Sequence, residues 1–355
     1  MTRFLLAGGG TAGHVNPLLA LAVALVADDG SNQVWALGTR EGLEATLVPQ
    51  RGYELLTVER LPFPRKPSWY AVTFPLRFLR AIRQVKRYLK ENQIDAVVGF
   101  GGYASAPAYL AAKSLGIPSV VHEANALPGC ANQLGAKSAK AVGVTFRSTP
   151  IANATFVGMP LRKEIEALAA NSEKESARLH FGLDPDTITL LVTGGSLGAK
   201  RINETIEKSR RVLSAAGIQV LHIMGGRSEL PEVHEKDYVR IAYCDRMDLA
   251  IAASSFAVSR AGSSTVSEFS ALGLPAAYVP YPVGNGEQKL NVADVVAGEG
   301  GLLVLDADFD EAFVANTLVP LISNSRALAE MAKSAKKVGI ADGTARLLAL
   351  VKGVL

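Results

Sequence analysis

The sequence predicts an α/β protein built from two Rossmann-like, doubly wound domains of parallel sheet. Short apolar strands alternate with helical patterns along the chain. A strand followed by a glycine loop and a helix occurs twice, over residues 3–29 and again over 187–213. The chain has 355 residues, which is long for one domain of this kind and enough for two.

The two domains are predicted over residues 1–160 and 161–342, with a hinge near the VGMPLR stretch at 157–162. A final helix, from about residue 343 to 355, is a candidate to pack back on the first domain. The first domain is expected to hold strands at 3–8, 33–38, 95–102 and 118–123. The second is expected to hold the strand that begins at 187 and others at 218–226, 238–244, 256–260 and 275–281.

Composition narrows the class of protein. Hydrophobic residues make up 48% of the chain and charged residues 20%, which predicts a large core and excludes global disorder. The two cysteines, Cys130 and Cys244, have no metal-ligand spacing, which favours a reduced, cytosolic setting. The strand that follows Met1 leaves no room for a signal peptide, and the longest apolar run, 17–27, is too short to span a bilayer.

The two glycine loops are candidate phosphate sites. Residues 8–13 match the G-x-G-x-x-G pattern, and residues 193–200 read TGGSLGAK, where Ser196 adds a hydroxyl. A strand that ends in glycines before a helix brings free N–H groups and the positive helix end to one point. The alternative is an ordinary turn that needs glycine for a positive φ. Two such loops favour a phosphate-bearing ligand between the domains.

The second strand argues against NAD as that ligand. A dinucleotide site needs an acidic residue at the end of this strand, about 20 positions after the loop. Gly38 and Thr39 stand there instead, with Arg40 next. NADP, read by Arg40, remains open.

His14 follows the first loop directly and lies near the start of a helix expected at about 16–29. In open α/β sheets the carboxyl ends of the strands face the ligand, so a histidine there can act as a general base. The alternative is a capping or packing histidine.

The stretch VSRAGSSTVSE at 258–268 has two interpretations. Thr265 and Glu268 have the spacing of a capping box. Alternatively, Glu268 accepts hydrogen bonds from the two hydroxyls of a ribose, beside the hydroxyls of Ser263, Ser264 and Thr265. Further on, residues 281–291 read as a polar glycine loop whose amides, Gln288 and Asn291, suit sugar hydroxyls; the alternative is a solvated loop.

Eight stretches occur together over nearly the whole chain. They are GGGTAGHVNP (8–17), GFGGYASAP (99–107), HEANALPG (122–129), VGMPLR (157–162), GGSLGA (194–199), RAGSSTVSE (260–268), GLPAAYVPYP (273–282) and EQKLN (287–291). In this order they resemble the UDP-N-acetylglucosamine–N-acetylmuramyl-(pentapeptide)-pyrophosphoryl-undecaprenol N-acetylglucosaminyltransferase family of bacterial peptidoglycan synthesis. The set is specific, although no single stretch is.

The resemblance implies a GT-B fold, with two Rossmann-like domains facing a central cleft that holds the donor. It implies transfer of N-acetylglucosamine from UDP to the 4-hydroxyl of N-acetylmuramoyl on an undecaprenyl carrier, with inversion. No cofactor and no metal are expected. Asp306-x-Asp308 looks like the metal motif of another glycosyltransferase fold, but its place before a helix favours capping.

The resemblance also implies roles for single residues. His14 becomes the leading general base, with Glu123 as its rival, and Glu268 is expected to hold the ribose. Cys244 stands where the family uses backbone atoms near uracil. The other expected substrate-binding residues are Thr11, Ala12, Gly13, Tyr103, Asn125, Arg162, Ser196, Ser263, Ser264, Thr265, Gln288 and Asn291.

A basic segment at 60–90 carries nine Lys and Arg and no acid. The rest of the chain has 28 basic against 33 acidic residues, which argues against a general nucleic-acid-binding surface. With a lipid-linked acceptor, we expect an aromatic turn at 69–74 to contact an anionic bilayer at the cytoplasmic face. The residues expected at that contact are Trp69, Tyr70, Phe74, Arg77 and Arg80. A stripe of Leu79, Ile82, Val85 and Leu89 is expected in the core.

Three rival functions remain at this stage. A UDP-N-acetylglucosamine 2-epimerase shares the architecture but gives the basic segment no role. An NADP oxidoreductase is an enzyme of another class. A UDP-sugar-binding membrane scaffold is the non-catalytic alternative. Cell-wall synthesis proteins are possible partners under the resemblance.

Overall fold

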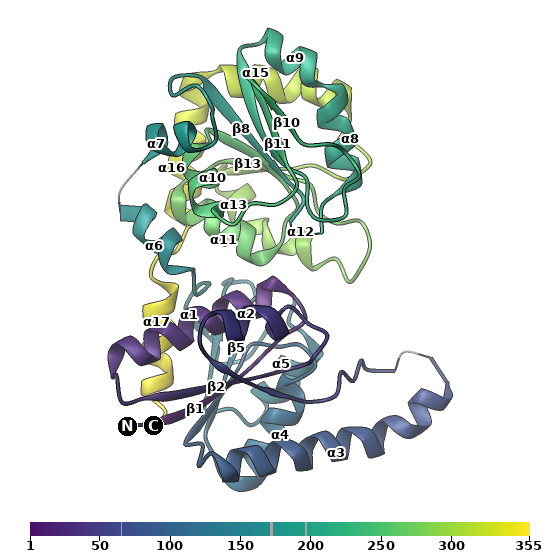
Figure 1. The fold of residues 1–355 in the computed structure, drawn as a ribbon, viewed down its shortest axis with the longest axis vertical. Coiled ribbons are helices and arrows are strands. Elements are labelled where there is room, and N and C mark those ends of the chain that lie inside the picture. Colours follow the sequence, from purple (N-terminus) through teal and green to yellow (C-terminus); the bar gives the residue numbers. More distant parts are fainter. Residues whose placement is uncertain (65, 171–172, 196) are drawn as a thin grey trace. The chain divides into compact units, whose positions relative to one another are not determined.

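The computed structural model of the chain describes all residues except 65, 171, 172 and 196. It divides into two compact units (Figure 1). Unit 1 comprises Met1–Arg162 and Asp342–Leu355, and unit 2 comprises Lys163–Ala341.

Unit 1 is a parallel sheet in the order β3-β2-β1-β4-β5-β6-β7. Its strands are β1 (Arg3–Ala7), β2 (Gln33–Gly38), β3 (Glu54–Thr57), β4 (Ala96–Gly99), β5 (Ser119–Glu123), β6 (Ala141–Val144) and β7 (Thr155–Phe156). The strand order reverses between β1 and β4. Ligands of open α/β sheets bind at such a switch point, so the loops that follow these two strands are the expected ligand-binding position.

Helices cover both faces of this sheet, and apolar side chains fill the space on each side. The helices are α1 (Ala12–Asp28), α2 (Glu44–Gln50), α3 (Trp69–Glu91), α4 (Ser105–Leu115), α5 (Cys130–Ala136) and α17 (Gly343–Lys352). The first of them begins four residues earlier than predicted, which includes His14 in its first turn. The last lies beside α1 and buries Leu347 and Val351 in the core of unit 1.

Unit 2 repeats the architecture with the strand order β10-β11-β9-β8-β12-β13-β14. Its strands are β8 (Ile188–Thr193), β9 (Ile218–Ile223), β10 (Val233–Glu235), β11 (Tyr238–Ile241), β12 (Phe256–Ser259), β13 (Ala276–Tyr278) and β14 (Gly301–Leu303). The short edge strand β10 is antiparallel to β11, and the other pairings are parallel. The order reverses between β8 and β12, directly after the second glycine-rich strand.

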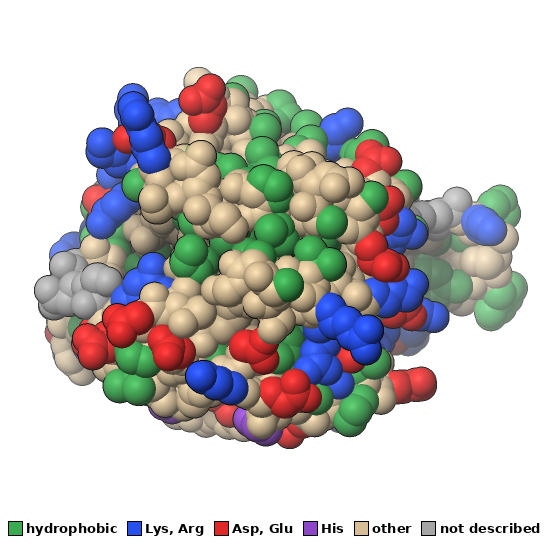
Figure 2. Space-filling view, turned by 90° about the horizontal axis from the view of Figure 1, so that it is seen from above, with side chains coloured by type: hydrophobic (Ala, Val, Ile, Leu, Met, Phe, Trp, Pro, Cys, Tyr) green, Lys and Arg blue, Asp and Glu red, His purple; other side chains and the backbone are tan. Residues whose placement is uncertain are grey.

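Most helices of unit 2 are short. They are α6 (Lys163–Ala170), α7 (Lys174–His180), α8 (Lys200–Lys208), α9 (Arg210–Ala215), α10 (Met247–Ala253), α11 (Ser263–Leu272), α12 (Glu287–Asn291), α13 (Ala293–Ala297), α14 (Glu311–Phe313), a π-helical turn η1 (Val314–Leu318), α15 (Val319–Ser323) and α16 (Ser325–Val338). The face shown in Figure 2 carries both signs of charge side by side. Within the described part of the chain, no helix combines the length and apolarity needed to cross a membrane.

The basic segment forms a long helix where the sequence suggested a turn. Ser68 caps α3, because its hydroxyl accepts a hydrogen bond from the N–H of Ala71 at 3.2 Å. The predicted aromatic turn at 69–74 is therefore wrong, and these residues form the first turns of the helix. The C-terminal half packs on α4 and buries Ala81, Val85 and Leu89. The N-terminal half runs out beyond α4 (Figure 1).

Candidate functional site

The switch point of unit 1 brings two glycine-rich turns together. The first glycine loop, residues 8–11, follows β1, and residues 100–104 follow β4. Gly102 has φ +80°, and a Cβ there would lie 2.6 Å from the carbonyl oxygen of Gly9. Gly101 has φ +95°, and its Cβ would lie 3.2 Å from Nε2 of His14. Only glycine allows the two turns to approach this closely while leaving room for the imidazole.

His14 is held in one orientation by the first glycine loop. Its Nδ1 lies 3.0 Å from the carbonyl oxygen of Gly9 and 3.4 Å from Oγ1 of Thr11. Because a carbonyl oxygen only accepts hydrogen bonds, the neutral ring carries its proton on Nδ1. Nε2 then presents its lone pair beside Gly101. The position and tautomer suit a general base.

Glu123, the rival carboxylate, is only 2% exposed at the end of β5. It accepts hydrogen bonds from the N–H groups of Asn125 and Gly129, at 2.9 and 3.0 Å, and from Nδ2 of Asn132 at 2.9 Å. Burial raises the pKa of Glu123, and these three hydrogen bonds work in the opposite direction. The carboxylate therefore fixes the turn that carries Asn125.

A buried carboxylate at the first glycine loop was missed by sequence reasoning. Glu44 begins α2 and is fully buried. It accepts a hydrogen bond from the N–H of Gly10 at 2.7 Å and two from Thr39. The available signal was the pair of glycines at 38 and 42, which make room for it.

The second glycine loop, residues 194–199, follows β8 at the switch point of unit 2. Ser196 lies outside the described residues. Gly198 has φ +82°, and a Cβ there would lie 2.3 Å from the carbonyl oxygen of Met224. The N–H of Gly195 donates to Oγ1 of Thr193 at 3.2 Å. The loop is thus packed backbone against backbone on the turn that follows β9.

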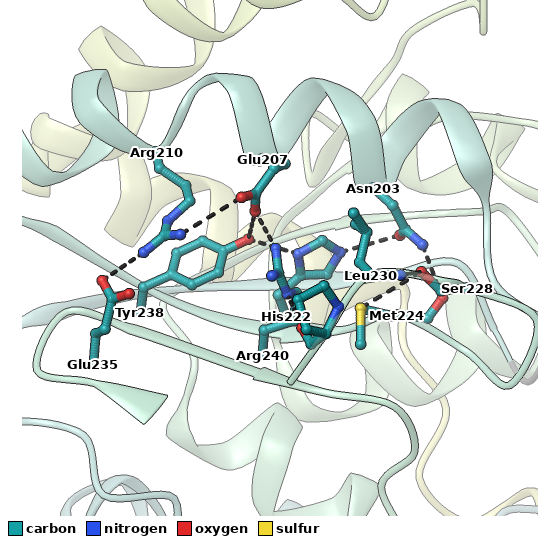
Figure 3. A network of polar contacts seen from close by, with 11 residues as sticks. Asn203, Glu207, Arg210, His222, Met224, Ser228, Leu230, Glu235, Tyr238 and Arg240 are labelled. Atoms are coloured by element: carbon teal, nitrogen blue, oxygen red, sulfur yellow. Dashed lines mark hydrogen bonds and ion pairs between the residues drawn. The ribbon is translucent and has the colours of Figure 1, made fainter. Parts of the chain in front are cut away.

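A polar network behind this loop fastens α8 to the sheet (Figure 3). Asn203 donates from Nδ2 to the carbonyl oxygen of Met224 at 3.0 Å, and its Oδ1 lies 3.1 Å from Nε2 of His222. Nδ1 of His222 lies 2.8 Å from the hydroxyl of Tyr238. Burial, followed by the nearby charge of Arg240, lowers the pKa of His222 to about 3. Asn203 and His222, which lie behind the second glycine loop, are therefore neutral.

The loop that follows β12 lies at the same switch point and leads into α11. This helix begins at Ser263, and its N-cap is Gly262. The predicted capping box is wrong, because Thr265 is already the third helical residue. Ser263 is buried, and Oγ of Ser264 is buried with no hydrogen-bond partner among the described residues. Glu268, in the second turn, is 8% exposed.

Gln288 and Asn291 lie on α12, where the sequence suggested a loop. The amide oxygen of Gln288 accepts hydrogen bonds from the N–H groups of Ala261, at 3.2 Å, and Tyr281, at 2.9 Å. Its remaining capacity is the NH₂ group, a donor suited to an anion or a hydroxyl. Asn291 is 1% exposed and donates to the carbonyl oxygen of Ala261 at 3.2 Å. With this hydrogen bond Asn291 supports the loop after β12, and its expected contact with a substrate stays a prediction.

Asp306 was expected to cap a helix, but it does not. It accepts a hydrogen bond from Arg260 at 2.5 Å, and the same guanidinium donates to the carbonyl oxygens of Val279 and Pro280. The cap of α14 is Asp310, which accepts from the N–H of Phe313 at 2.8 Å.

The remaining expected residues are distributed over both units. Thr11 is exposed, and Ala12, Gly13, Tyr103, Asn125 and Arg162 are half-buried in unit 1. The ring of Tyr103 lies under the guanidinium of Arg60, 5.3 Å from its centroid. Cys244 is buried after β11 in unit 2.

The five expected membrane residues separate into two groups. Trp69 is 80% exposed, and Arg80 is exposed. Tyr70, Phe74 and Arg77 instead hold the segment at 59–63 against α3. The hydroxyl of Tyr70 donates to the carbonyl oxygen of Pro62, Phe74 contacts Phe63 edge-on, and Arg77 pairs with Glu59.

An exposed apolar stripe on α3 is formed by Trp69, Val72, Leu76 and Leu79. The spacing of three and four residues places these side chains on one side of the helix. Leu79 is 47% exposed, so its predicted place in the core is wrong, whereas Val85 and Leu89 are buried as predicted. Ile82 packs against the core.

Two Rossmann-like units of parallel sheet, each with a glycine loop at its switch point, define a glycosyltransferase of the GT-B fold. The profile of the glycosyltransferase family 28 N-terminal domain matches residues 4–144, and that of the family 28 C-terminal domain matches residues 189–347. The chain belongs to glycosyltransferase family 28.

Curated relatives are similar to the chain over nearly its whole length. The UDP-N-acetylglucosamine–N-acetylmuramyl-(pentapeptide) pyrophosphoryl-undecaprenol N-acetylglucosamine transferase of Clavibacter sepedonicus is 55% identical, over 99% of this chain and 96% of the relative. The transferase of the same name from Streptomyces coelicolor is 48% identical, over 98% of this chain and 96% of the relative.

Solved structures agree on the fold. MurG of Acinetobacter baumannii matches with a TM-score of 0.79 and 26% identity, over 99% of this chain and 100% of that one. A UDP-GlcNAc 2-epimerase from Neisseria meningitidis, bound to UDP-GlcNAc, matches with a TM-score of 0.69 and 16% identity, over 99% and 100%. At that identity the similarity to the epimerase shows the shared fold alone.

Proposed function

We propose that this chain transfers N-acetylglucosamine from UDP-N-acetylglucosamine to undecaprenyl-pyrophosphoryl-N-acetylmuramoyl-pentapeptide, with inversion, in peptidoglycan synthesis. The observation that carries the proposal is the 55% identity, over nearly the full length of both chains, to a transferase with this name. The membership in family 28 makes the chain a glycosyltransferase, which the oxidoreductase and scaffold alternatives do not explain.

In this proposal His14 removes the proton from the attacking hydroxyl of the acceptor. The hydrogen bond from Nδ1 to Gly9 leaves the lone pair on Nε2, where a base needs it. Inversion in one displacement requires such a base. The half-buried position of His14 at the switch point of unit 1 leaves the ring within reach of a ligand.

Glu123 positions this site in the proposal and does not compete for the proton. Its carboxylate is buried and accepts three hydrogen bonds from the chain itself. A general base must reach the proton it removes. Both carboxylate oxygens of Glu123 already accept hydrogen bonds, from Asn125, Gly129 and Asn132. Its replacement should therefore disturb the turn after β5 before it disturbs proton transfer.

Unit 2 holds the nucleotide sugar in the proposal. The second glycine loop and the start of α11 offer N–H groups and hydroxyls at one switch point, which favours a pyrophosphate. Oγ of Ser264 and the NH₂ group of Gln288 supply further donors. Glu268 is placed in the second turn of α11, where a carboxylate can accept from both ribose hydroxyls.

Unit 1 associates with the membrane through the apolar stripe of α3 in the proposal. Trp69, Val72 and Leu76 are each more than half exposed, and such a contiguous apolar surface needs an occupant. The exposed cations Arg80, Arg83 and Arg87 follow on the same helix. Aromatic and aliphatic groups beside cations suit an anionic bilayer, which is also where a polyprenyl-linked acceptor resides.

The deciding experiment is release of UDP from UDP-N-acetylglucosamine with and without the lipid-linked acceptor. The native chain should release UDP only when the acceptor is present. His14→Ala should lower kcat by about a hundredfold or more while the donor still binds, because only the proton acceptor is lost. Glu54→Gln, a carboxylate change on β3 away from His14, is the matched control and should leave kcat unchanged.

Two results would count against the proposal. Native chain that binds the donor without acceptor-dependent release would overturn the transferase. Undiminished release by His14→Ala would agree with the transferase activity but show that another residue is the base. Glu123→Gln would then be the next variant to assay.

The membrane contact is tested separately by flotation with vesicles that contain an anionic lipid. Trp69→Ala with Leu76→Ala should lose binding, and Arg80→Glu should weaken it in a salt-dependent way. Arg77→Glu is predicted to act mainly on the fold, because Arg77 pairs with Glu59. Equal flotation of all variants would refute the contact without touching the transferase proposal.

A further inference from the structure

We propose that Glu44 is a positioning residue that fixes the orientation and tautomer of His14 through the peptide bond between Gly9 and Gly10. This inference rests on the proposed function, because it names a residue that serves the base of that reaction. It goes beyond the sequence motifs, since Glu44 lies outside all of them.

One peptide unit connects the carboxylate to the imidazole. The carbonyl oxygen of Gly9 and the N–H of Gly10 belong to the same planar group. The oxygen accepts from Nδ1 of His14 at 3.0 Å, and the N–H donates to Oε2 of Glu44 at 2.7 Å. Because a trans peptide directs these two groups to opposite sides, the carboxylate and the ring hold the same plane from both sides.

The other carboxylate oxygen anchors Glu44 itself. Oε1 accepts from the N–H and from Oγ1 of Thr39, each at 2.8 Å. Thr39 directly follows β2 and is buried, so the anchor is held next to the sheet. Glu44 is fully buried, which shields these hydrogen bonds from water and strengthens them.

Three glycines leave space for this carboxylate. A Cβ at Gly9 would lie 2.2 Å from a Glu44 carboxylate oxygen, and a Cβ at Gly42 would lie 2.1 Å from one. A Cβ at Gly38 would lie 2.4 Å from Cγ of the same side chain. The local backbone is thus shaped around Glu44, and a glycine in the first loop serves a carboxylate of the chain.

The arrangement has a chemical consequence for the base. A peptide whose N–H donates to a carboxylate has a more strongly accepting carbonyl, so the Gly9 oxygen holds the proton of Nδ1 firmly. Nε2 is then kept as the site that takes up the substrate proton. The imidazolium that forms is stabilised through the same peptide, as an aspartate does directly in hydrolytic triads.

The test is Glu44→Gln, which keeps the shape of the side chain. Its amide oxygen still accepts from Thr39, but its NH₂ group cannot accept from the N–H of Gly10. We expect kcat to fall by about tenfold to a hundredfold, less than for His14→Ala, with the KM for UDP-N-acetylglucosamine unchanged. The ring ¹⁵N shifts of His14 should show loss of the single Nδ1–H tautomer. Glu54→Gln, which alters a carboxylate that accepts from Trp35, should change neither.

A double-mutant cycle separates positioning from a merely structural role. If Glu44 acts through His14, adding Glu44→Gln to His14→Ala should cost no further loss of kcat. Additive losses would overturn the proposal, as would an unchanged ¹⁵N spectrum in Glu44→Gln. The ¹⁵N measurement needs no turnover, so it stands even where the native chain fails as a transferase. If Glu44→Gln does not fold, Thr39→Val, which removes only the hydroxyl donor, should give a smaller change of the same kind.

Discussion

The two glycine loops have nearly the same sequence signature and different surroundings. In unit 1 the N–H of Gly10 is turned to the buried carboxylate of Glu44. In unit 2 the groups behind the loop are the neutral Asn203 and His222. A carboxylate disfavours an anion beside it, so the first loop is better suited to hold an imidazole and the second to hold a pyrophosphate. A glycine loop therefore acquires its chemistry from what lies behind it.

The strongest test of this division replaces one glycine in each unit. Gly198→Ala and Gly102→Ala each force a side chain into a positive φ and against a backbone oxygen, at 2.3 and 2.6 Å. Each should cost about 3 kcal/mol locally. We expect Gly198→Ala to weaken UDP-N-acetylglucosamine binding by about a hundredfold in calorimetry. Gly102→Ala should keep donor affinity and lose turnover.

A third glycine supplies the control for backbone strain. Gly217 has φ +69° but open space around its Cβ position. Gly217→Ala should destabilise unit 2 by about 1 kcal/mol and leave donor affinity intact. Equal loss of donor affinity in Gly102→Ala and Gly198→Ala would break the division between the loops.

The next largest expected difference between the units is their loss of stability at acid pH. Burial lowers the pKa of His122, on β5, to about 4, and that of His222, on β9, to about 3. In the unfolded chain both side chains bind a proton near pH 6.5, so stability is lost as the pH falls from about 6.5 toward these values. The full shifts correspond to about 3 kcal/mol for His122 and about 5 kcal/mol for His222. Hydrogen exchange in β5 and β9 measures the loss in each unit.

Unit 1 has an opposing group beside its histidine. Burial raises the pKa of Glu123, so the folded state gains stability as the pH falls through that raised value. Unit 2 should therefore lose protection first on acidification. The amide of His122→Gln can still donate to the carbonyl oxygen of Gly158. This variant should reduce the loss of hydrogen-exchange protection at acid pH in β5 and leave that in β9 unchanged. Parallel loss of protection in β5 and β9 would contradict this assignment.

A single charge behind the second loop gives a sharper and smaller test. Asn203→Asp keeps the size of the side chain but removes the donor to Met224 and adds a negative charge. We expect the dissociation constant of UDP to rise by about tenfold, which is about 1.4 kcal/mol. Glu204→Gln, one residue further on the exposed side of α8, is the control and should not weaken binding. Unchanged affinity in Asn203→Asp would mean that the charge behind the loop is irrelevant.

Much of this frame was predictable from the sequence. The apolar strands and the glycines after them indicate both switch points, and His14, Ser264 and Glu268 lie in the first two turns of the helices that follow β1 and β12. The short strands β3, β6, β7 and β10 were not predicted. Two to four residues carry too little periodicity to separate a strand from a loop.

The errors share a physical cause. Sequence reasoning assigned no role to Glu44, because its burial depends on the backbone path of Gly38 and Gly42. Asn291 also has a partner that the local sequence does not show, the carbonyl oxygen of Ala261, 30 residues away in the chain. Thr265 does not cap α11, because the N-cap is Gly262, three residues earlier. Local patterns show which groups exist, and tertiary contacts decide which of them are already occupied.

The smallest expected effect concerns the surfaces of the two units. Leu79 on α3 and Val212 on α9 are 47% and 42% exposed, so Leu79→Ser and Val212→Ser should each change the free energy of unfolding by less than about 0.5 kcal/mol. Only Leu79 belongs to the apolar stripe, so only Leu79→Ser should reduce flotation with anionic vesicles. Reduced flotation in both would mean that any exposed apolar side chain suffices. In that case α3 would have no special role at the membrane, and the apolar stripe would need another occupant.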